Sequence, residues 1–333
     1  MIEGAGADAD ENVSEADGGI GDILVAELVE PAVLLERQPS WGSLPGAPAT
    51  VRRWAGRRMM REHANSQALH MWQNRRMSRE PEPLDALIAT VREWISGARS
   101  IVALTGAGIS TDSGIPDFRG PQGVWTKNPA AEKAATLQNY LTDPEIRKSA
   151  WRRRLESALP APRPNPGHLA LVALERRGKL DTLITQNVDG LHIEAGTSPA
   201  RVVEIHGHTR EVVCMDCDER APMERALARV RAGEEDPPCR SCGGVLKAAT
   251  ISFGQSLVAD DLSRAHTAAS RCDLMLAVGS TLSVFPIAGV VPVAKEAGAR
   301  VVILNAEPTA MDDIADVVLR GSISAILPRL AET

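Results

Sequence analysis

The chain has 333 residues, of which 44% are hydrophobic, 24% charged and only 3% aromatic, so its core must consist mainly of aliphatic side chains. A net charge of −6 argues against general affinity for nucleic acid, and no apolar run is long enough to span a bilayer. We therefore expect one large globular domain and a smaller one, with neither a membrane nor a sequence-specific nucleic-acid partner.

Residues 1–80 differ in composition from the rest. The first 30 residues carry nine acidic residues and no Lys or Arg, the reverse of a signal or transit peptide, whereas residues 31–80 carry nine Arg and three Glu. We interpret residues 1–80 as a disordered extension and residues 81–330 as the folded domain. Because the N-terminal composition is unlike a signal or transit peptide, we expect a cytoplasmic location. In that reducing compartment, cysteines serve more often as metal ligands than as disulfides.

After residue 83, short apolar runs alternate with helical patterns, beginning with Leu84, Leu87, Ile88, Val91 and Ile95 at helical spacing. The expected strands are Ile101–Thr105, Thr182–Gln186, Val202–Ile205, Leu274–Val278, Val301–Asn305 and Asp316–Leu319. The expected helices are Pro166–Arg177, Ala259–Ser270, Pro286–Ala297 and Ile323–Ala331. This alternation predicts an α/β fold with a Rossmann-like, doubly wound parallel sheet, whose ligands bind beyond the carboxyl ends of the strands.

The first expected strand runs into the sequence GAGISTDSGIPDFRG, from Gly106 to Gly120. The Gly-Ala-Gly turn lets backbone amides approach a pyrophosphate, although a mere tight turn would explain these glycines alone. Thr111 stands where a hydride-transfer fingerprint has its third glycine, and the residues after the turn do not favour the usual helix. We expect the triplet Asp117-Phe118-Arg119 to be buried, with residues 121–141 covering the site.

Four expected strand ends are polar or glycine-rich, and parallel strands would bring them to one crevice. These ends are Gly106–Gly108, Gln186–Asp189, Gly279–Thr281 and Asn305–Glu307.

Among the seven histidines, His206 follows an expected strand directly and should project into this crevice. His208 is the second candidate for that place. We expect His168 to cap or pack at a helix start and His192 to form a structural hydrogen bond.

Four of the five cysteines form two Cys-x-x-Cys pairs, Cys214 with Cys217 and Cys239 with Cys242. Two such knuckles complete a tetrahedral Zn²⁺ site without an open position, so we expect one structural zinc in an insertion at residues 208–250. A nucleic-acid-binding ribbon is the alternative, but the loop between the two pairs carries Glu219, Glu224, Glu234, Glu235 and Asp236 among its bases. Cys272 precedes an apolar strand and is expected to be an inert core thiol.

In these motifs the chain resembles the sirtuin family of NAD-dependent protein lysine deacylases, in particular class II-like members. The resemblance covers residues 86–330. It includes GAGIST with SGIPDFRG, TQNVDGLH, Ile205-His206-Gly207, the paired cysteines, Phe253-Gly254 and Asn305-Ala306-Glu307. The family fold is a Rossmann-like domain with a smaller zinc-ribbon and helical lobe, and NAD and an acyl-lysine peptide or protein enter the cleft between them.

The resemblance implies that the acyl oxygen attacks the nicotinamide ribose, releasing nicotinamide, O-acyl-ADP-ribose and deacylated lysine. His206, as general base, and Asn187 and Asp189 would be the catalytic residues. The residues implied to bind NAD are Gly106, Ala107, Gly108, Thr111, Asp117, Phe118, Arg119, Gln186, Asn187, Val188, Asp189, Gly279, Ser280, Thr281, Asn305, Ala306, Glu307 and Ile323.

The sequence departs from the family pattern at two places that concern the substrate. Gln255 replaces the usual acid after Phe-Gly. Members that prefer succinyl groups carry a Tyr-x-x-Arg pair, whereas here Ala150 precedes Arg153, so we do not expect a dedicated desuccinylase. Deacetylation is the favoured activity. A long-chain deacylase, an NAD-dependent mono-ADP-ribosyltransferase and a non-catalytic NAD- or peptide-binding module are the alternatives.

Overall fold

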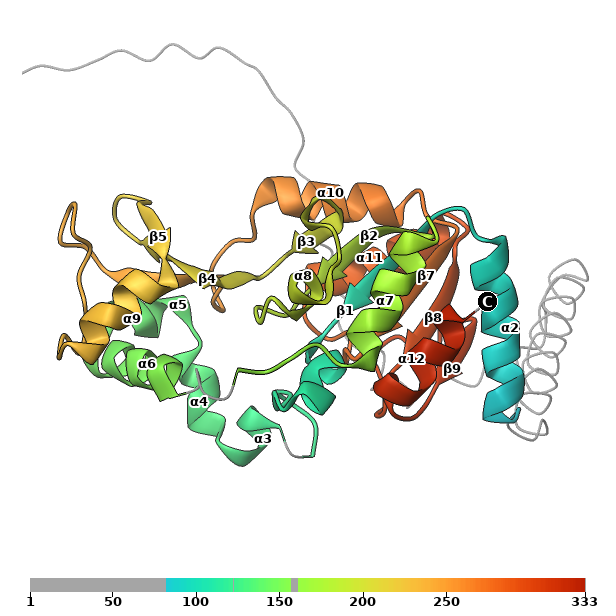
Figure 1. Cartoon of the computed structure of the whole chain (residues 1–333), viewed down its shortest axis with the longest axis horizontal. Coiled ribbons are helices and arrows are strands. Elements are labelled where there is room, and N and C mark those ends of the chain that lie inside the picture. Colours follow the sequence, from blue (N-terminus) through green and yellow to red (C-terminus); the bar gives the residue numbers. More distant parts are fainter. Residues whose placement is uncertain (1–81, 122, 157–160, 333) are drawn as a thin grey trace, which may run out of the picture. The chain divides into compact units, whose positions relative to one another are not determined.

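The computed structural model describes residues 82–121, 123–156 and 161–332 (Figure 1). The extension predicted for residues 1–80 lies outside this range. Residues 79–333 form one compact unit. None of the helices within the described residues has the length and apolarity that crossing a membrane requires.

A six-stranded, all-parallel sheet forms the larger part of this unit, and its strand order is β3-β2-β1-β7-β8-β9. The strands are β1 (Ile101–Thr105), β2 (Leu180–Thr185), β3 (Val202–Glu204), β7 (Leu274–Val278), β8 (Arg300–Leu304) and β9 (Val317–Leu319). The order reverses beside β1, the switch point at which a doubly wound sheet opens a crevice for its ligand. The predicted fold class is therefore confirmed.

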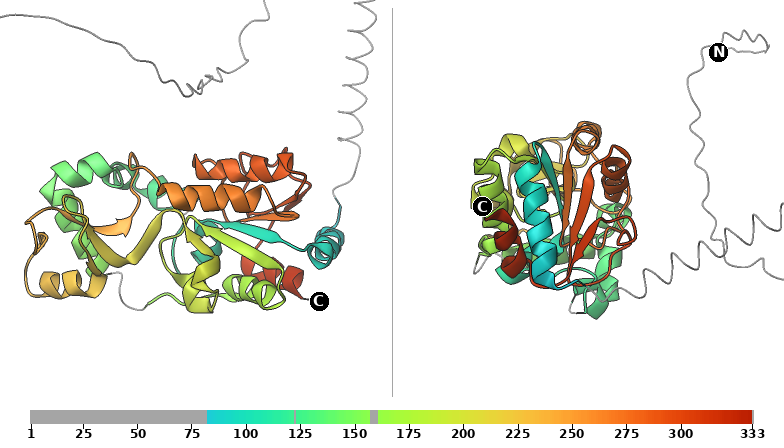
Figure 2. Two further views of the ribbon diagram at one scale, coloured as in Figure 1. Left: turned by 90° about the horizontal axis from the view of Figure 1, so that it is seen from above. Right: turned by 90° about the vertical axis from the view of Figure 1, so that its right-hand side faces the viewer.

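Alternate residues of each strand enter two separate cores, as the two-residue period of a strand requires. Ile101 and Ala103 face α2, α7 and α12, whereas Val102 and Leu104 face α10 and α11. Helices thus cover both faces, and Figure 2 shows the strands between the two layers. The covering helices are α2 (Leu84–Gly97), α7 (Pro166–Arg176), α8 (Leu191–Ala195), α10 (Ala259–Ala269), α11 (Val290–Glu296) and α12 (Ile323–Ala331). We call the six-stranded sheet and these helices the large lobe.

Two segments that are distant in sequence pack together as the small lobe, residues 124–156 and 207–250. The first contains α3 (Val124–Lys127), α4 (Pro129–Ala134), α5 (Leu137–Thr142) and α6 (Pro144–Glu156). The second contains the antiparallel sheet β5-β4-β6, from β4 (Gly207–Cys214), β5 (Arg220–Pro222) and β6 (Leu246–Thr250), with α9 (Met223–Arg231). Trp151 of α6 is fully buried against residues of β4, α9 and β6, which joins the two segments.

Most predicted elements are present with ends shifted by a residue or two, but two regions differ. The expected helix at residues 286–297 begins as the 3₁₀ turn η3 (Ile287–Gly289), where the Gly289 N–H donates to the carbonyl of Pro286 three residues back, before α11. The turn after β1 was expected to lack a helix but forms a seven-residue 3₁₀ helix, η1 (Ala107–Ser113). The remaining 3₁₀ turn, η2, spans Pro199–Arg201.

Candidate active site at the junction of the two lobes

A cavity of about 1370 Å³ lies where the carboxyl ends of the large-lobe strands meet the small lobe. Its volume exceeds the range of about 300–1,000 Å³ usual for small-ligand pockets, which leaves room for a dinucleotide and a second substrate. His206 and every residue predicted to bind the dinucleotide line this cavity, whereas His208 is not among the lining residues. Fold topology therefore brings together the four strand ends singled out in the sequence.

The glycines at the end of β1 allow two backbone segments to touch. The Gly108 N–H donates to the Gly279 carbonyl over 2.8 Å. A Cβ atom at Gly108 would lie 2.8 Å from the Gly279 Cα, closer than such atoms approach one another. The loops after β1 and β7 thus pack backbone against backbone at the floor of the cavity, where a side chain would force them apart.

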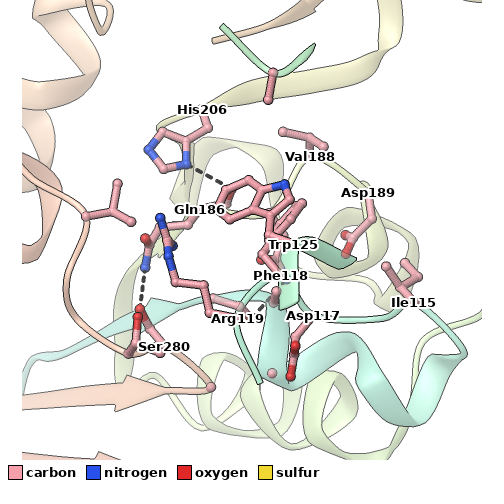
Figure 3. Close-up of a pocket in the computed structure, with 18 of the residues that line it drawn as sticks. Ile115, Asp117, Phe118, Arg119, Trp125, Gln186, Val188, Asp189, His206 and Ser280 are labelled. Atoms are coloured by element: carbon pink, nitrogen blue, oxygen red, sulfur yellow. Dashed lines mark hydrogen bonds between the residues drawn. The ribbon is translucent and has the colours of Figure 1, made fainter. Parts of the chain in front are cut away.

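The triplet that the sequence predicted to be buried is largely exposed instead. Asp117 is half-buried, while Phe118 retains 45% of its accessible surface and Arg119 is also exposed. The centroid of the Phe118 ring lies 4.7 Å from that of Trp125, and the Arg119 guanidinium lies over the Trp125 ring, 4.6 Å from its centroid (Figure 3). Trp125 also contacts Phe253, at 5.4 Å. These side chains contact one another and the cavity, which explains why they stay outside the core.

The segment expected only to cover the site, residues 121–141, contributes the helices α3, α4 and α5. Phe253 is tied to the chain just beyond α4 through its backbone: its N–H donates to the carbonyl of Ala135, and its own carbonyl accepts from Leu137. The covering segment is therefore fixed to the strand-like residues at the cavity edge.

Polar side chains from the loop after β2 form a connected network. Gln186 Nε2 donates to Ser280 Oγ at 2.9 Å, which links this loop to the end of β7 (Figure 3). Asn187 Nδ2 donates to the carbonyl of Gly106 and to Ser110 Oγ, both at 3.1 Å. Ser110 Oγ donates in turn to Asp189 Oδ2 at 2.8 Å. Ser110 was not predicted as a site residue, because its place between Asn187 and Asp189 depends on how η1 packs.

His206 follows β3 and faces the cavity. Its Nδ1 lies 3.1 Å from the carbonyl oxygen of Gln186, which orients the ring (Figure 3). Burial lowers the pKa of His206 below its usual value, and the contact with Gln186 partly opposes this. A neutral imidazole that faces a ligand cavity is suited to accept a proton.

Several small-lobe side chains also line the cavity, and two of them, Tyr140 and Lys247, were not singled out in the sequence. Tyr140, the only tyrosine of the chain, donates its hydroxyl to the Leu246 carbonyl at 2.9 Å. Lys247 is almost fully buried, which lowers the pKa of its amine to about 8. Ala150 and Arg153, compared above with a Tyr-x-x-Arg pair, both lie on the cavity wall. These residues come from α5, α6 and β6, so only tertiary packing could gather them.

The four predicted zinc ligands form one cluster in the small lobe. Their sulfur atoms all lie within 4.8 Å of one another, with 3.5 Å between Cys214 and Cys242 and 3.8 Å between Cys217 and Cys239. Four Zn–S bonds of ideal tetrahedral length place the sulfurs about 3.8 Å apart, so the donor set fits one zinc ion. Cys272 lies apart in the large-lobe core, where burial raises the pKa of its thiol to about 11.

Comparison with known proteins identifies the family of this chain. The Sir2 family model matches residues 106–286. "NAD-dependent protein deacetylase 2" of Streptomyces coelicolor is 50% identical over 236 residues, which are 71% of this chain and 98% of that protein. The chain therefore belongs to the Sir2 family.

Two solved structures share the fold. One, described as "Structural Basis for the Mechanism and Regulation of Sir2 Enzymes", has a TM-score of 0.68 at 37% identity and covers 74% of this chain and 97% of its own. The other, "Sir2-p53 peptide-NAD+", has a TM-score of 0.64 at 32% identity and covers 72% and 94% of the two chains. The expected resemblance to sirtuins is thus confirmed.

Proposed function

We infer that this protein is an NAD-dependent protein lysine deacetylase that releases nicotinamide, O-acetyl-ADP-ribose and the free lysine. The observation that carries this inference is the meeting of His206 with the Asn187–Asp189 network and the glycine loop in one cavity. The family supports it, since a relative is named a deacetylase and a related structure is described with both a peptide and NAD+.

NAD is the co-substrate and, when bound, supplies the ribose carbon that receives the acyl oxygen as nicotinamide leaves. We propose that the loops after β1, β7 and β8 hold its phosphates and its adenosine. The Ala107 N–H, at the start of η1, suits the pyrophosphate, and the flanking Gly106 and Gly108 carry no side chain that would keep a phosphate away from it. Gln186, Asn187 and Asp189 would orient the nicotinamide and its ribose, and Phe118 would shield the reacting face from water.

We propose His206 as the general base for the ribose hydroxyl. The base must be neutral to accept a proton, and burial favours the neutral form of its imidazole. The contact of its Nδ1 with the Gln186 carbonyl leaves Nε2 as the atom that would take this proton. This tautomer assigns the donor role to Nδ1.

The zinc ion that fits the four cysteines would be structural, because four thiolates leave no open coordination position. We propose that residues 81–330 act as the catalytic domain and residues 208–250 as its zinc-binding insertion. We also propose a cytoplasmic location, which suits a protein whose metal site needs reduced thiols.

The test is turnover of an acetyl-lysine peptide with and without NAD, followed by mass spectrometry. We expect NAD consumption only when the peptide is present, and a loss of at least about 100-fold in kcat for His206→Ala. His266→Ala, on the outer helix α10, is the matched control and should keep full activity.

The same assay separates the alternatives. ADP-ribose bound to protein would indicate a mono-ADP-ribosyltransferase, and faster turnover of myristoyl than acetyl peptide would indicate a long-chain deacylase. Unchanged turnover by His206→Ala would show that the base is wrongly assigned.

A further inference from the structure

Two buried histidines, His168 and His192, face each other directly behind the active-site loops. We call them the histidine pair. Their ring centroids lie 4.8 Å apart with an interplanar angle of 55°. His168 retains none of its accessible surface and His192 only 2%, so neither reaches a ligand in the cavity.

Each member of the pair anchors a different part of the site. His192 Nε2 lies 2.9 Å from Thr105 Oγ1, at the residue where β1 enters the glycine loop. His168 Nδ1 accepts from the backbone N–H of Asn165 at 3.3 Å. The Asn165 side chain donates to the carbonyl of Ile109 at 2.7 Å and to Ser113 Oγ at 3.0 Å, so it holds the third and the last residue of η1.

The two anchors meet at the network of Asn187 and Asp189. The Leu191 N–H, at the start of α8, donates to Asp189 Oδ1 at 2.9 Å, and His192 is the next residue of that helix. On the other side, Ser110 of η1 donates to Asp189 Oδ2 and accepts from Asn187. The orientation of both side chains therefore depends on α8 and η1, the two elements that the histidine pair joins.

The histidine pair is electrically neutral at the pH of an ordinary assay. Burial lowers the pKa of His192 to about 3, and the neighbouring His168 contributes in the same direction. Burial also lowers the pKa of His168, partly opposed by the charge of Asp189. Two imidazoles that do not ionise and do not touch the cavity cannot act as acid or base in the reaction, so their role must be one of position.

We propose that the histidine pair consists of positioning residues, which hold Asn187 and Asp189 in the orientation needed for cleavage of the nicotinamide bond. This inference rests on the proposed function. It predicts a selective defect in the first chemical step, the release of nicotinamide. His206, proposed as the base for the ribose hydroxyl after that release, is held separately, by Gln186.

The experiment uses the full chain and compares nicotinamide exchange into NAD, which reports the first step, with complete deacetylation. Thr105→Val removes the hydroxyl at nearly constant shape, and His192→Leu removes the imidazole. His192→Gln is the conservative variant, since its amide can replace Nε2 toward Thr105. Thr182→Val, whose hydroxyl bonds only the adjacent Asp181, and His266→Leu are the matched controls.

We expect Thr105→Val and His192→Leu to slow nicotinamide exchange about tenfold and to raise KM for NAD, with KM for the peptide unchanged within about twofold. His192→Gln should recover exchange to within about threefold of the wild type. Both controls should behave like the wild type. Thermal unfolding identifies any variant that does not fold. If His192→Leu does not fold, the nearly isosteric variant Thr105→Val tests the proposal in its place.

Two results would overturn the proposal. The first is wild-type exchange in a folded Thr105→Val protein, or equal losses of exchange in His192→Gln and His192→Leu. The second comes from ¹⁵N-histidine NMR, which does not need activity: the His192 ring should stay neutral from pH 8 to pH 5.5, and its protonation near pH 6.5 would contradict a neutral pair. A wild-type protein with neither exchange nor deacetylation would refute the proposed function instead, and the NMR result would still decide on the pair.

Discussion

The two lobes that enclose the cavity differ in what stabilises each of them internally. The large lobe has two aliphatic cores, one on each face of a parallel sheet whose strands β1 and β7 are buried along their whole length. The small lobe has a single core of nine buried residues, and two of these are the cysteines Cys214 and Cys239. A core of this size stabilises little by itself. We therefore expect the small lobe, unlike the large lobe, to need a metal ion bound by its four cysteines in order to stay folded.

This contrast explains where the chemistry lies. The glycine loop, the Asn187–Asp189 network and the histidine pair all belong to the large lobe, whose packing can hold side chains in fixed orientation. The small lobe contributes one wall of the cavity from α5, α6 and β6. We therefore expect damage to the small lobe to affect substrate access and local folding, and damage to the large lobe to affect the whole unit.

Removal of zinc should have the largest effect on stability, and it should unfold the small lobe while the large lobe stays folded. Structural zinc sites contribute on the order of 10 kcal/mol of apparent binding free energy, far more than the small-lobe core can replace. We expect chelation, or Cys217→Ser, to abolish hydrogen-exchange protection in β4, β5 and β6 while protection in β1 and β7 remains. Cys272→Ala is the control, because this thiol lies in the large-lobe core. Simultaneous loss of protection in both lobes would contradict the comparison.

Cavity formation in the large-lobe core should have the next largest effect. Leu104 of β1 is fully buried against the α10–α11 layer, so Leu104→Ala should lower the free energy of unfolding by about 2–5 kcal/mol. Leu227→Ala, in the small-lobe core, should lower the free energy of unfolding by less than Leu104→Ala does while zinc is bound. Urea denaturation of both variants measures the difference. Equal losses would show that the small-lobe core matters as much as the large one.

Acid should destabilise the large lobe through the histidine pair. The pKa of His192 is about 3 in the folded protein and 6.5 when exposed, so the unfolded chain binds an extra proton between these values. The contribution of His192 to the free energy of unfolding is therefore fully present above pH 6.5. Between pH 6.5 and pH 3 it falls by about 1.4 kcal/mol for each pH unit. Urea denaturation from pH 7 to pH 5 should show a shallower pH dependence for His192→Gln than for the wild type. Identical slopes would exclude this contribution.

The smallest effects should come from the ion pairs by which α6 joins the two segments of the small lobe. Arg147 Nε donates to Asp236 at 2.8 Å, and its Nη1 donates to the carbonyls of Tyr140 and Leu141. Arg147→Met should lower the melting temperature of the small lobe through a loss of about 1–2 kcal/mol, since only 12% of the Arg147 side chain is exposed. Lys148 is more exposed, at 30%, and pairs with Glu145 at 2.9 Å and Glu235 at 3.6 Å, so Lys148→Met should lower the melting temperature by less than Arg147→Met does.

The sequence predicted the sheet well because buried parallel strands are continuous apolar runs, as at Ile101–Thr105 and Leu274–Val278. It predicted the burial of Asp117-Phe118-Arg119 wrongly, because apolar character alone does not distinguish a core ring from one that stacks on other rings at a cavity. It also missed the 3₁₀ helix after β1, whose short-range hydrogen bonds tolerate residues that disfavour an α-helix.

The sequence by itself determined the family, the residues at the strand ends and the four cysteines that form one cluster. These features follow from local order along the chain: a glycine turn after an apolar run, a histidine after a strand, two pairs of thiols at fixed spacing. Only the tertiary structure decided which distant residues meet. Ser110 between Asn187 and Asp189, Trp125 against Phe253, and His168 against His192 are contacts between separate elements, and their geometry is fixed by packing that no local pattern records.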